Sequence, residues 1–219
     1  MTILSIFDFF KDIFHHPMAM FKPEDIIKYG GMLLLFLCVY AQIGLFFCFF
    51  LPGDALLFTT GVFVATGNFD QPILSVCIVL VIAAFMGNLS AYIFGRKAGP
   101  LLFKRKDSIF FKHEHLITAD QFFQKNGAIA VTGCFFLPII RTFTPVIAGV
   151  VKYPFPRFVL CSLLGALLWI NILVLAGYFL GDVPFVEKNL KYIILGMIIG
   201  LTLPVILKIV RSSRGIKTK

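Results

Sequence analysis

The chain has 219 residues, of which 59% are hydrophobic and 14% charged, a composition that excludes a soluble globular protein. Residues 29–53, 71–95 and 158–181 contain no Asp, Glu, Lys or Arg. Each stretch is long enough to cross a hydrocarbon core, which needs about 20 helical residues. We therefore expect a single membrane domain over residues 1–219, with any chemistry inside the membrane or at its surface.

The net charge of +9 comes from 20 Lys and Arg against 11 Asp and Glu. In a membrane protein such an excess indicates cytoplasmic helix ends and contact with anionic lipids, so no nucleic-acid partner is predicted. The 5 cysteines lie in apolar surroundings without paired metal spacing. They predict neither a disulfide framework nor a metal site, and the chain carries no cofactor motif.

The N-terminal segment, residues 1–28, is expected to lie at the membrane interface. Residues 3–14 place isoleucine and phenylalanine side chains on one helical face and charged ones elsewhere, which is typical of an interfacial amphipathic helix. The side of the membrane on which the N-terminus lies depends on the path of segment 31–51. A full crossing places the N-terminus inside, whereas one arm of a deep hairpin places it outside.

The first of two repeats is expected over residues 30–95, and its apolar start is interrupted by Pro52 and Gly53. Proline removes a backbone donor and glycine adds flexibility, so a continuous helix is not expected there. A broken helix at membrane depth is tolerated where protein or a wet cavity covers the freed groups. We therefore predict that residues 54–67 belong to a re-entrant hairpin with Asp54 near its tip.

The chain then turns on the outer face at residues 68–72, which contain no Lys or Arg, and residues 73–95 span inward. Residues 96–125 hold 7 Lys and Arg, so the positive-inside rule places them in the cytoplasm. Apolar residues between these charges predict amphipathic helices lying on the membrane surface in this loop.

The second repeat is expected over residues 126–181. Residues 126–140 are uncharged but too short to span, and Arg141 follows them, then Pro145 and Gly149. This pattern predicts a second re-entrant hairpin that enters from the cytoplasm and leaves on the same side.

Residues 158–180 are predicted to span outward, and a last transmembrane helix over residues 190–210 returns to a basic, cytoplasmic C-terminus. The fold class is therefore an all-α polytopic membrane protein, with transmembrane helices, interfacial amphipathic helices and an inverted repeat of two re-entrant hairpins.

The repeat is visible in matched residues. Cys-Phe-Phe-Leu-Pro occurs at residues 48–52 and again at residues 134–138, and a Tyr-x-Phe/Leu-Gly segment lies 40 residues after each proline. If the two halves are inverted, the hairpin tips meet near the midplane and bring Asp54 towards Arg141.

Two interpretations of this charge pair stay open. One is a structural ion pair that pins the hairpins together. The other is functional, because an isolated charge at the bilayer centre costs about 2.5–3.5 kcal/mol and needs a reason. Arg141 would then be a donor fork for a phosphate or carboxylate, and Asp54 a proton carrier.

The residues of both hairpins resemble the DedA family of bacterial membrane proteins. Phe50-Leu51-Pro52-Gly53-Asp54 resembles its first signature. The second signature is resembled by residues 136–149, in which Pro138, Arg141, Thr142, Pro145 and Gly149 stand at the family spacing. Arg157-Phe158, Trp169 and Gly177-Tyr178-x-x-Gly181 also match.

The resemblance implies two facing re-entrant hairpins and a role in moving lipids across the bilayer. In bacteria it implies recycling of undecaprenyl phosphate, linked to the proton motive force, and eukaryotic relatives resemble phospholipid scramblases. The residues that match the two signatures become candidates for substrate binding and transport. The implied location is the bacterial cytoplasmic (inner) membrane.

The chain departs from the family pattern at two positions. Many members have an acid twelve positions before Asp54, where this chain has Gln42, and an arginine six positions before Arg141, where it has Phe135. The combined loss is neutral in charge, which suggests a deleted ion pair. It places proton coupling in question and makes Gln42 a further candidate site residue.

We therefore expect a lipid translocase, a flippase or scramblase for undecaprenyl phosphate or a phospholipid, with membrane lipids and protons as partners. An ion-coupled transporter of a small anionic solute and a non-transporting membrane assembly factor remain alternatives. No Ser-His-Asp set or phosphatase signature is present, so an enzyme is not expected. The sequence leaves homo-oligomerisation open.

Overall fold

The structure is a computed structural model, and it describes residues 23–45, 53–104, 113–137 and 140–181, together with Val183, Tyr192 and Gly196. The predicted amphipathic helix at residues 3–14 and the last transmembrane helix at residues 190–210 lie outside the described residues, apart from the two single positions within the latter.

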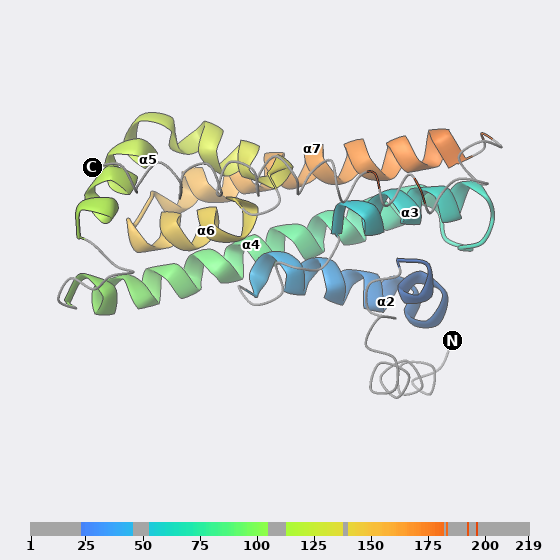
Figure 1. Cartoon of the computed structure of the whole chain (residues 1–219), viewed down its shortest axis with the longest axis horizontal. Helices are drawn as coiled ribbons and strands as arrows, with labels where there is room; N and C mark the ends of the chain where they lie inside the picture. The colour runs from blue at the N-terminus through green and yellow to red at the C-terminus, as the bar shows by residue number, and fades with distance from the viewer. Residues whose placement is uncertain are drawn as a thin grey trace, which may run out of the picture.

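Every regular element in the described ranges is helical, which confirms the all-α class. The elements are α2 (Pro23–Gly44), α3 (Gly53–Ala65), α4 (Ile73–Lys104), α5 (His113–Gly133), the 3₁₀ turn η3 (Cys134–Phe136), α6 (Ile140–Val150) and α7 (Phe155–Gly181). Figure 1 shows α4 and α7 running along the long axis, with α2 and α3 towards one end and α5 and α6 towards the other.

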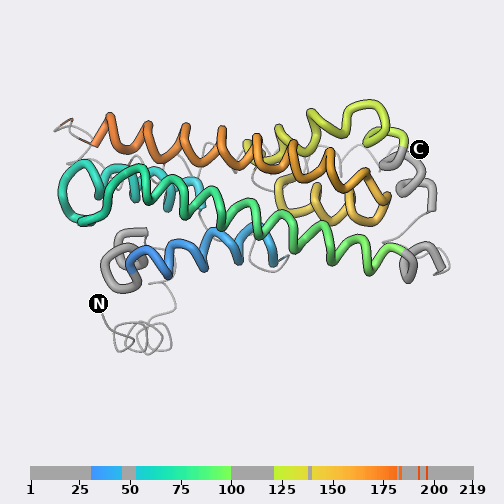
Figure 2. Tube along the Cα trace, turned by 180° about the vertical axis from the view of Figure 1, so that it is seen from behind, coloured from blue at the N-terminus to red at the C-terminus, as the bar shows by residue number. Residues whose placement is uncertain are grey.

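Within the described ranges, two helices are long and apolar enough to cross a membrane. The apolar part of α4, Ile73–Gly99, and the whole of α7, Phe155–Gly181, each contain 27 residues. At 1.5 Å per residue each is about 40 Å long, which exceeds a hydrocarbon core of about 30 Å. Both also expose large apolar side chains, such as Leu74 and Phe179, as helices facing lipid do. Figure 2 shows the two helices from behind.

The other apolar helices are short. They comprise Gly31–Gly44 within α2, Gly53–Ala65 (α3) and Ile140–Val150 (α6). The first begins at a break in α2, where Gly31 has φ 55° and ψ −149°, a conformation open to glycine. Gly31–Gly44 rises about 21 Å, so this helix alone does not cross the core.

Two helices extend across the limits expected for the repeats and the basic loop. Helix α4 continues from its apolar part through Arg96 and Lys97 to Lys104. Helix α5 runs from His113 to Gly133 and so joins the end of the basic segment to the start of the apolar one. The expected limits of the repeats stay a prediction, since a repeat need not begin or end at a helix end.

Glycines bring helix backbones close together in two pairs of helices, α3 with α7 and α6 with α4. In these two pairs a Cβ atom at each of four glycines would lie under 3.0 Å from a backbone oxygen of the partner helix. These are Gly61 and Gly177 between α3 and α7, and Gly95 and Gly149 between α4 and α6. Small residues allow helix backbones to approach in this way inside membranes.

The replacement of one contact glycine by alanine should therefore separate a helix pair. We expect Gly61→Ala and Gly149→Ala each to destabilise the fold by about 1–3 kcal/mol, because the added methyl meets backbone that cannot rotate away. Thermal unfolding of the purified protein in detergent measures this.

The matched control is Gly133→Ala, since a Cβ there meets nothing within 4 Å. Equal melting temperatures for Gly61→Ala, Gly149→Ala and Gly133→Ala would contradict the proposed role of glycine in the packing.

Candidate functional site

Asp54 lies in the first turn of α3, directly after Gly53, with which the helix begins. Its Oδ1 accepts two hydrogen bonds, from Arg141 Nη1 at 2.8 Å and from Trp169 Nε1 at 2.9 Å. A carboxylate is also favoured at the positive end of a helix dipole. Three elements far apart in the sequence therefore converge on one oxygen atom.

Arg141 lies in the first turn of α6, and only 2% of its surface is exposed. It forms an ion pair with Asp54, and its guanidinium carbon lies 4.7 Å from the centroid of the Trp169 ring, within range of a cation–π interaction. Its Nε is buried and has no hydrogen-bond partner among the residues that the structure describes. The expected approach of Asp54 and Arg141 is thus present, and one buried donor beside it is left over.

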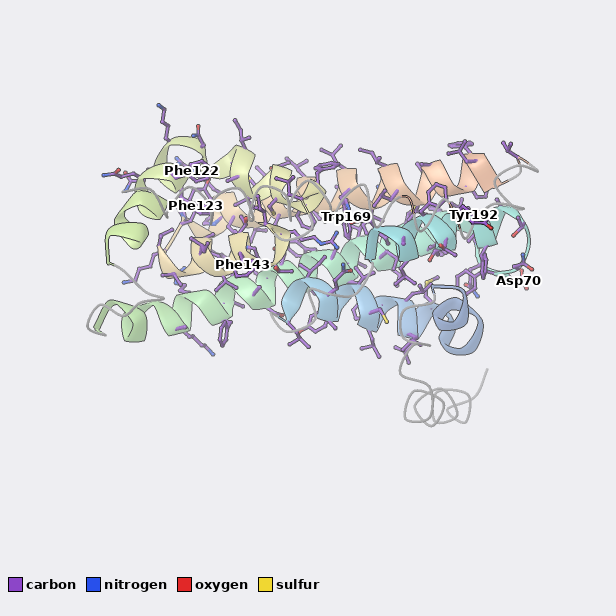
Figure 3. All side chains as sticks on the ribbon, in the orientation of Figure 1. Asp70, Phe122, Phe123, Phe143, Trp169 and Tyr192 are labelled. Atoms are coloured by element: carbon purple, nitrogen blue, oxygen red, sulfur yellow. The ribbon has the colours of Figure 1, made fainter. Side chains whose placement is uncertain are left out.

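Trp169 of α7 is the third residue of the site, since it contacts both Asp54 and Arg141. In the sequence it stood out only as a match to the family within a predicted span. Figure 3 places it near the middle of the long axis. The sequence does contain a signal for a role of Trp169 in the site. It is the single tryptophan of the chain and lies inside a charge-free span, where a buried indole N–H needs an acceptor. The nature of that acceptor could not be read from the sequence, because Asp54 is 115 residues away along the chain.

The two positions that depart from the family pattern both lie beside this site. Gln42 is 1% exposed, and its side-chain amide lies against Gly53, where a Cβ atom would clash with it. Phe135 is also 1% exposed, and its ring lies 5.8 Å from the ring of Trp169. An uncharged amide therefore lies against the residue that precedes Asp54, and an aromatic ring lies against Trp169.

Three of the remaining predicted site residues lie in α6. Thr142 is buried next to Arg141, and Pro145 is buried within the helix. Gly149 packs against the backbone of Tyr92, so the structure places it in the contact between α4 and α6. Pro52 and Pro138 lie outside the described residues. Within the described ranges no group of three His, Cys, Asp or Glu side chains could hold a metal ion.

The ion pair should behave as a coupled unit in stability measurements. Asp54→Ala leaves Arg141 buried without its partner, and breaking a buried pair in this way costs about 3–5 kcal/mol. In the double variant Asp54→Ala/Arg141→Met no uncompensated charge remains, so we expect it to be more stable than Asp54→Ala. Thermal unfolding of wild type, both single variants and the double variant gives the coupling free energy.

Additive effects of the two substitutions would show that the side chains do not depend on each other, and would contradict this geometry.

Comparison with known proteins places the chain in a family. The family model described as the VTT domain matches residues 51–179. The chain is 38% identical over 191 residues to the uncharacterized membrane protein ML0287 of Mycobacterium leprae, covering 87% of this chain and 85% of that protein. It is 35% identical over 194 residues to Protein DedA of Escherichia coli, covering 88% and 89%.

A third relative is the uncharacterized membrane protein MT0380 of Mycobacterium tuberculosis, at 40% identity over 187 residues, which cover 84% of this chain and 80% of that protein. No solved structure matches the chain. The resemblance to the DedA family is confirmed. The chain belongs to the VTT-domain family and is a membrane protein related to Protein DedA.

Proposed function

We propose that the chain is a lipid translocase of the bacterial cytoplasmic membrane, a flippase or scramblase, and that Arg141 binds the phosphate of its cargo. The cargo class is a phosphate-bearing lipid, either undecaprenyl phosphate or a phospholipid. The observation that carries the proposal is the buried Nε of Arg141, for which the described part of the chain offers no hydrogen-bond partner.

A guanidinium group has five N–H donors in a planar fork that matches phosphate oxygens. Asp54 accepts from Nη1, and the indole of Trp169 lies against the guanidinium group. A buried donor left unpaired costs about 1–3 kcal/mol, and more on a charged group. An acceptor oxygen at Nε would remove that cost, and the N-terminus of α6 adds a further preference for an anion there.

The proposed architecture places this site near the bilayer midplane. Asp54 and Arg141 each begin a short apolar helix, α3 and α6, and these helices pack reciprocally against α7 and α4. Such packing fits two re-entrant hairpins related by an inverted repeat, whose broken ends meet at the substrate site. The basic end of α4, with Arg96 and Lys97, then faces the cytoplasm, as does the C-terminus.

In the proposed cycle Asp54 acts as the gate. It holds Arg141 in the resting state, and an incoming phosphate competes with it for the guanidinium group. Asp54 is then freed to take up a proton or to turn towards Trp169, whose indole already donates to it. Because position 42 is an uncharged glutamine, Asp54 acts without a second acid, and we propose that proton coupling is weak.

Translocation in proteoliposomes tests the proposal directly. Labelled undecaprenyl phosphate and a labelled phospholipid are compared, with wild type, Arg141→Gln and Asp54→Asn. We expect Arg141→Gln to slow movement of the preferred lipid by at least about tenfold, since losing a charged hydrogen bond is worth about 1.5–3 kcal/mol. The matched control is Lys97→Gln, an exposed basic residue outside the site.

Arg141→Gln protein that folds and still translocates at the wild-type rate would overturn the proposal. Absence of lipid movement in wild type would instead favour the two alternatives, an ion-coupled transporter of a small anionic solute or an assembly factor with a structural Asp54–Arg141 pair.

Proton coupling is tested by restoring an acid. Gln42→Glu would place a second carboxylate near Asp54, and two acids facing one arginine favour protonation of one of them. We expect translocation by wild type to respond little to an imposed pH gradient and translocation by Gln42→Glu to respond strongly. Equal responses in both proteins would contradict the proposed role of position 42.

A further inference from the structure

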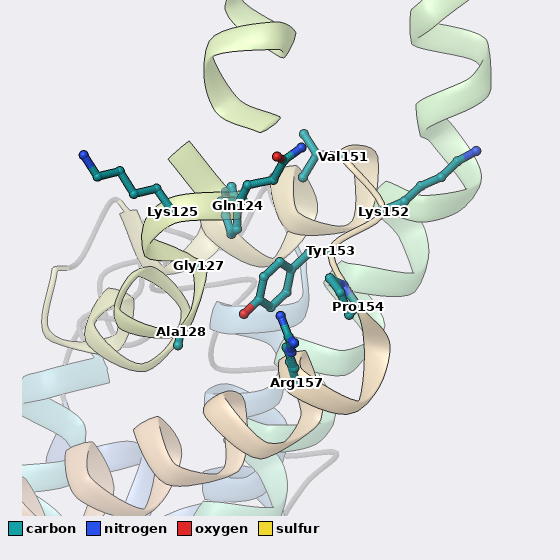
Figure 4. A pocket seen from close by; sticks show the side chains of 10 residues that line it. Gln124, Lys125, Gly127, Ala128, Val151, Lys152, Tyr153, Pro154 and Arg157 are labelled. Atoms are coloured by element: carbon teal, nitrogen blue, oxygen red, sulfur yellow. The ribbon is translucent and has the colours of Figure 1, made fainter. Parts of the chain in front are cut away.

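A second polar region lies at the far end of α6 from Arg141. There α5, the connection between α6 and α7, and the first turn of α7 enclose a cavity of about 640 Å³ (Figure 4). Helix α6 spans 11 residues, so about 16 Å separates its two ends. The cavity is therefore distinct from the Asp54–Arg141 site. Its volume lies within the range of about 300–1,000 Å³ that is usual for ligand pockets.

The charged residues that line this cavity are all basic. Lys125 comes from α5, Lys152 from the connection and Arg157 from α7, and no Asp or Glu is among the lining residues. In the described part of the chain none of the three forms an ion pair, since the one salt bridge found there joins Arg141 to Asp54. Figure 4 shows Arg157 next to Tyr153, and it shows Lys125 and Lys152 at opposite margins of the cavity with their side chains pointing outward.

Tyr153 provides a rigid wall with a polar group. Its ring packs against Phe123 at 5.8 Å, and Gly127 lies so close that a Cβ atom there would clash with the ring. The hydroxyl of Tyr92 donates a 2.6 Å hydrogen bond to the carbonyl oxygen of Tyr153. The phenol of Tyr153 is protonated at neutral pH, as an unperturbed tyrosine is, and burial raises its pKa further, so it can donate a hydrogen bond.

Lys152 occupies a backbone position that favours glycine. Its φ is 55°, and the N–H groups of Lys152 and Tyr153 bond to the carbonyls of Gly149 and Ala148, which is the Schellman pattern that ends α6. Glycine is the usual residue at this position because it has no Cβ. The chain thus carries a lysine side chain at the margin of the cavity where the backbone alone would prefer none.

We propose that this cavity is a second phosphate site, which binds a phosphate ester presented by a lipid headgroup or by a soluble molecule. Arg157 and the Tyr153 hydroxyl lie side by side and supply one charged and one neutral donor, and Lys125 and Lys152 add two further positive charges at the exposed margins. Basic pockets at the cytoplasmic end of membrane helices bind lipid head groups in the same way. The proposal concerns binding alone and does not depend on lipid translocation.

The test uses the full chain in phosphatidylcholine nanodiscs, titrated either with phosphatidic acid in the bilayer or with inorganic phosphate in solution. Hydrogen–deuterium exchange of residues 150–158 reports on the cavity and not on Arg141. We expect phosphate to slow exchange there, and Lys152→Gly and Arg157→Gln each to weaken binding about fivefold.

Lys152→Gly is the sharper variant because glycine suits φ 55°, so its melting temperature should not fall and lost binding cannot be assigned to misfolding. Lys97→Gln, which removes an exposed charge of α4, should bind like wild type.

Protection by phosphatidic acid alone identifies a lipid headgroup, and protection by inorganic phosphate identifies a soluble phosphate ester. Wild-type affinity in both Lys152→Gly and Arg157→Gln, or no protection by either probe, would overturn the proposal. Arg141→Gln should keep this protection even if it abolishes translocation, so the two proposals fail separately.

Discussion

The ion pair between Asp54 and Arg141 is the interaction on which the centre of the molecule depends. Its two charges sit at the first turns of α3 and α6, and Trp169 of α7 contacts both of them. Inside an apolar bundle neither charge is tolerable alone, so each helix start requires the other. The pair thereby ties the two halves of the chain to each other and to α7.

The glycine contacts make this arrangement possible. Because α3 approaches α7 through Gly61 and Gly177, the start of α3 is held beside the indole of Trp169. The contact of α6 with α4 through Gly95 and Gly149 holds Arg141 in the same way. A site made from helix ends needs rigid supports, since a small shift of either helix would move a charge out of hydrogen-bond range.

The two polar regions of the described structure differ in charge. The central site is nearly balanced, with one arginine, one carboxylate and one unpaired donor, whereas the cavity at the end of α6 is basic throughout. In the proposed cycle Asp54 competes with the phosphate of the cargo for the guanidinium group of Arg141, and this competition would allow the balanced site to release its cargo. A basic cavity at the bundle's end lacks such competition and is suited to retaining a phosphate. The two proposals thus assign exchange to the first site and binding to the second.

The amino-acid sequence by itself determined the class of protein, its two long apolar helices and its family, because hydrophobic runs and signature residues are local properties. It also pointed to Asp54 and Arg141, since charges inside apolar runs are conspicuous. Only the tertiary structure decided that Trp169 joins the pair, that Gln42 and Phe135 lie beside it, and that Lys125, Lys152 and Arg157 share a cavity. These groupings depend on how helices distant in sequence are packed, and no local pattern encodes that packing.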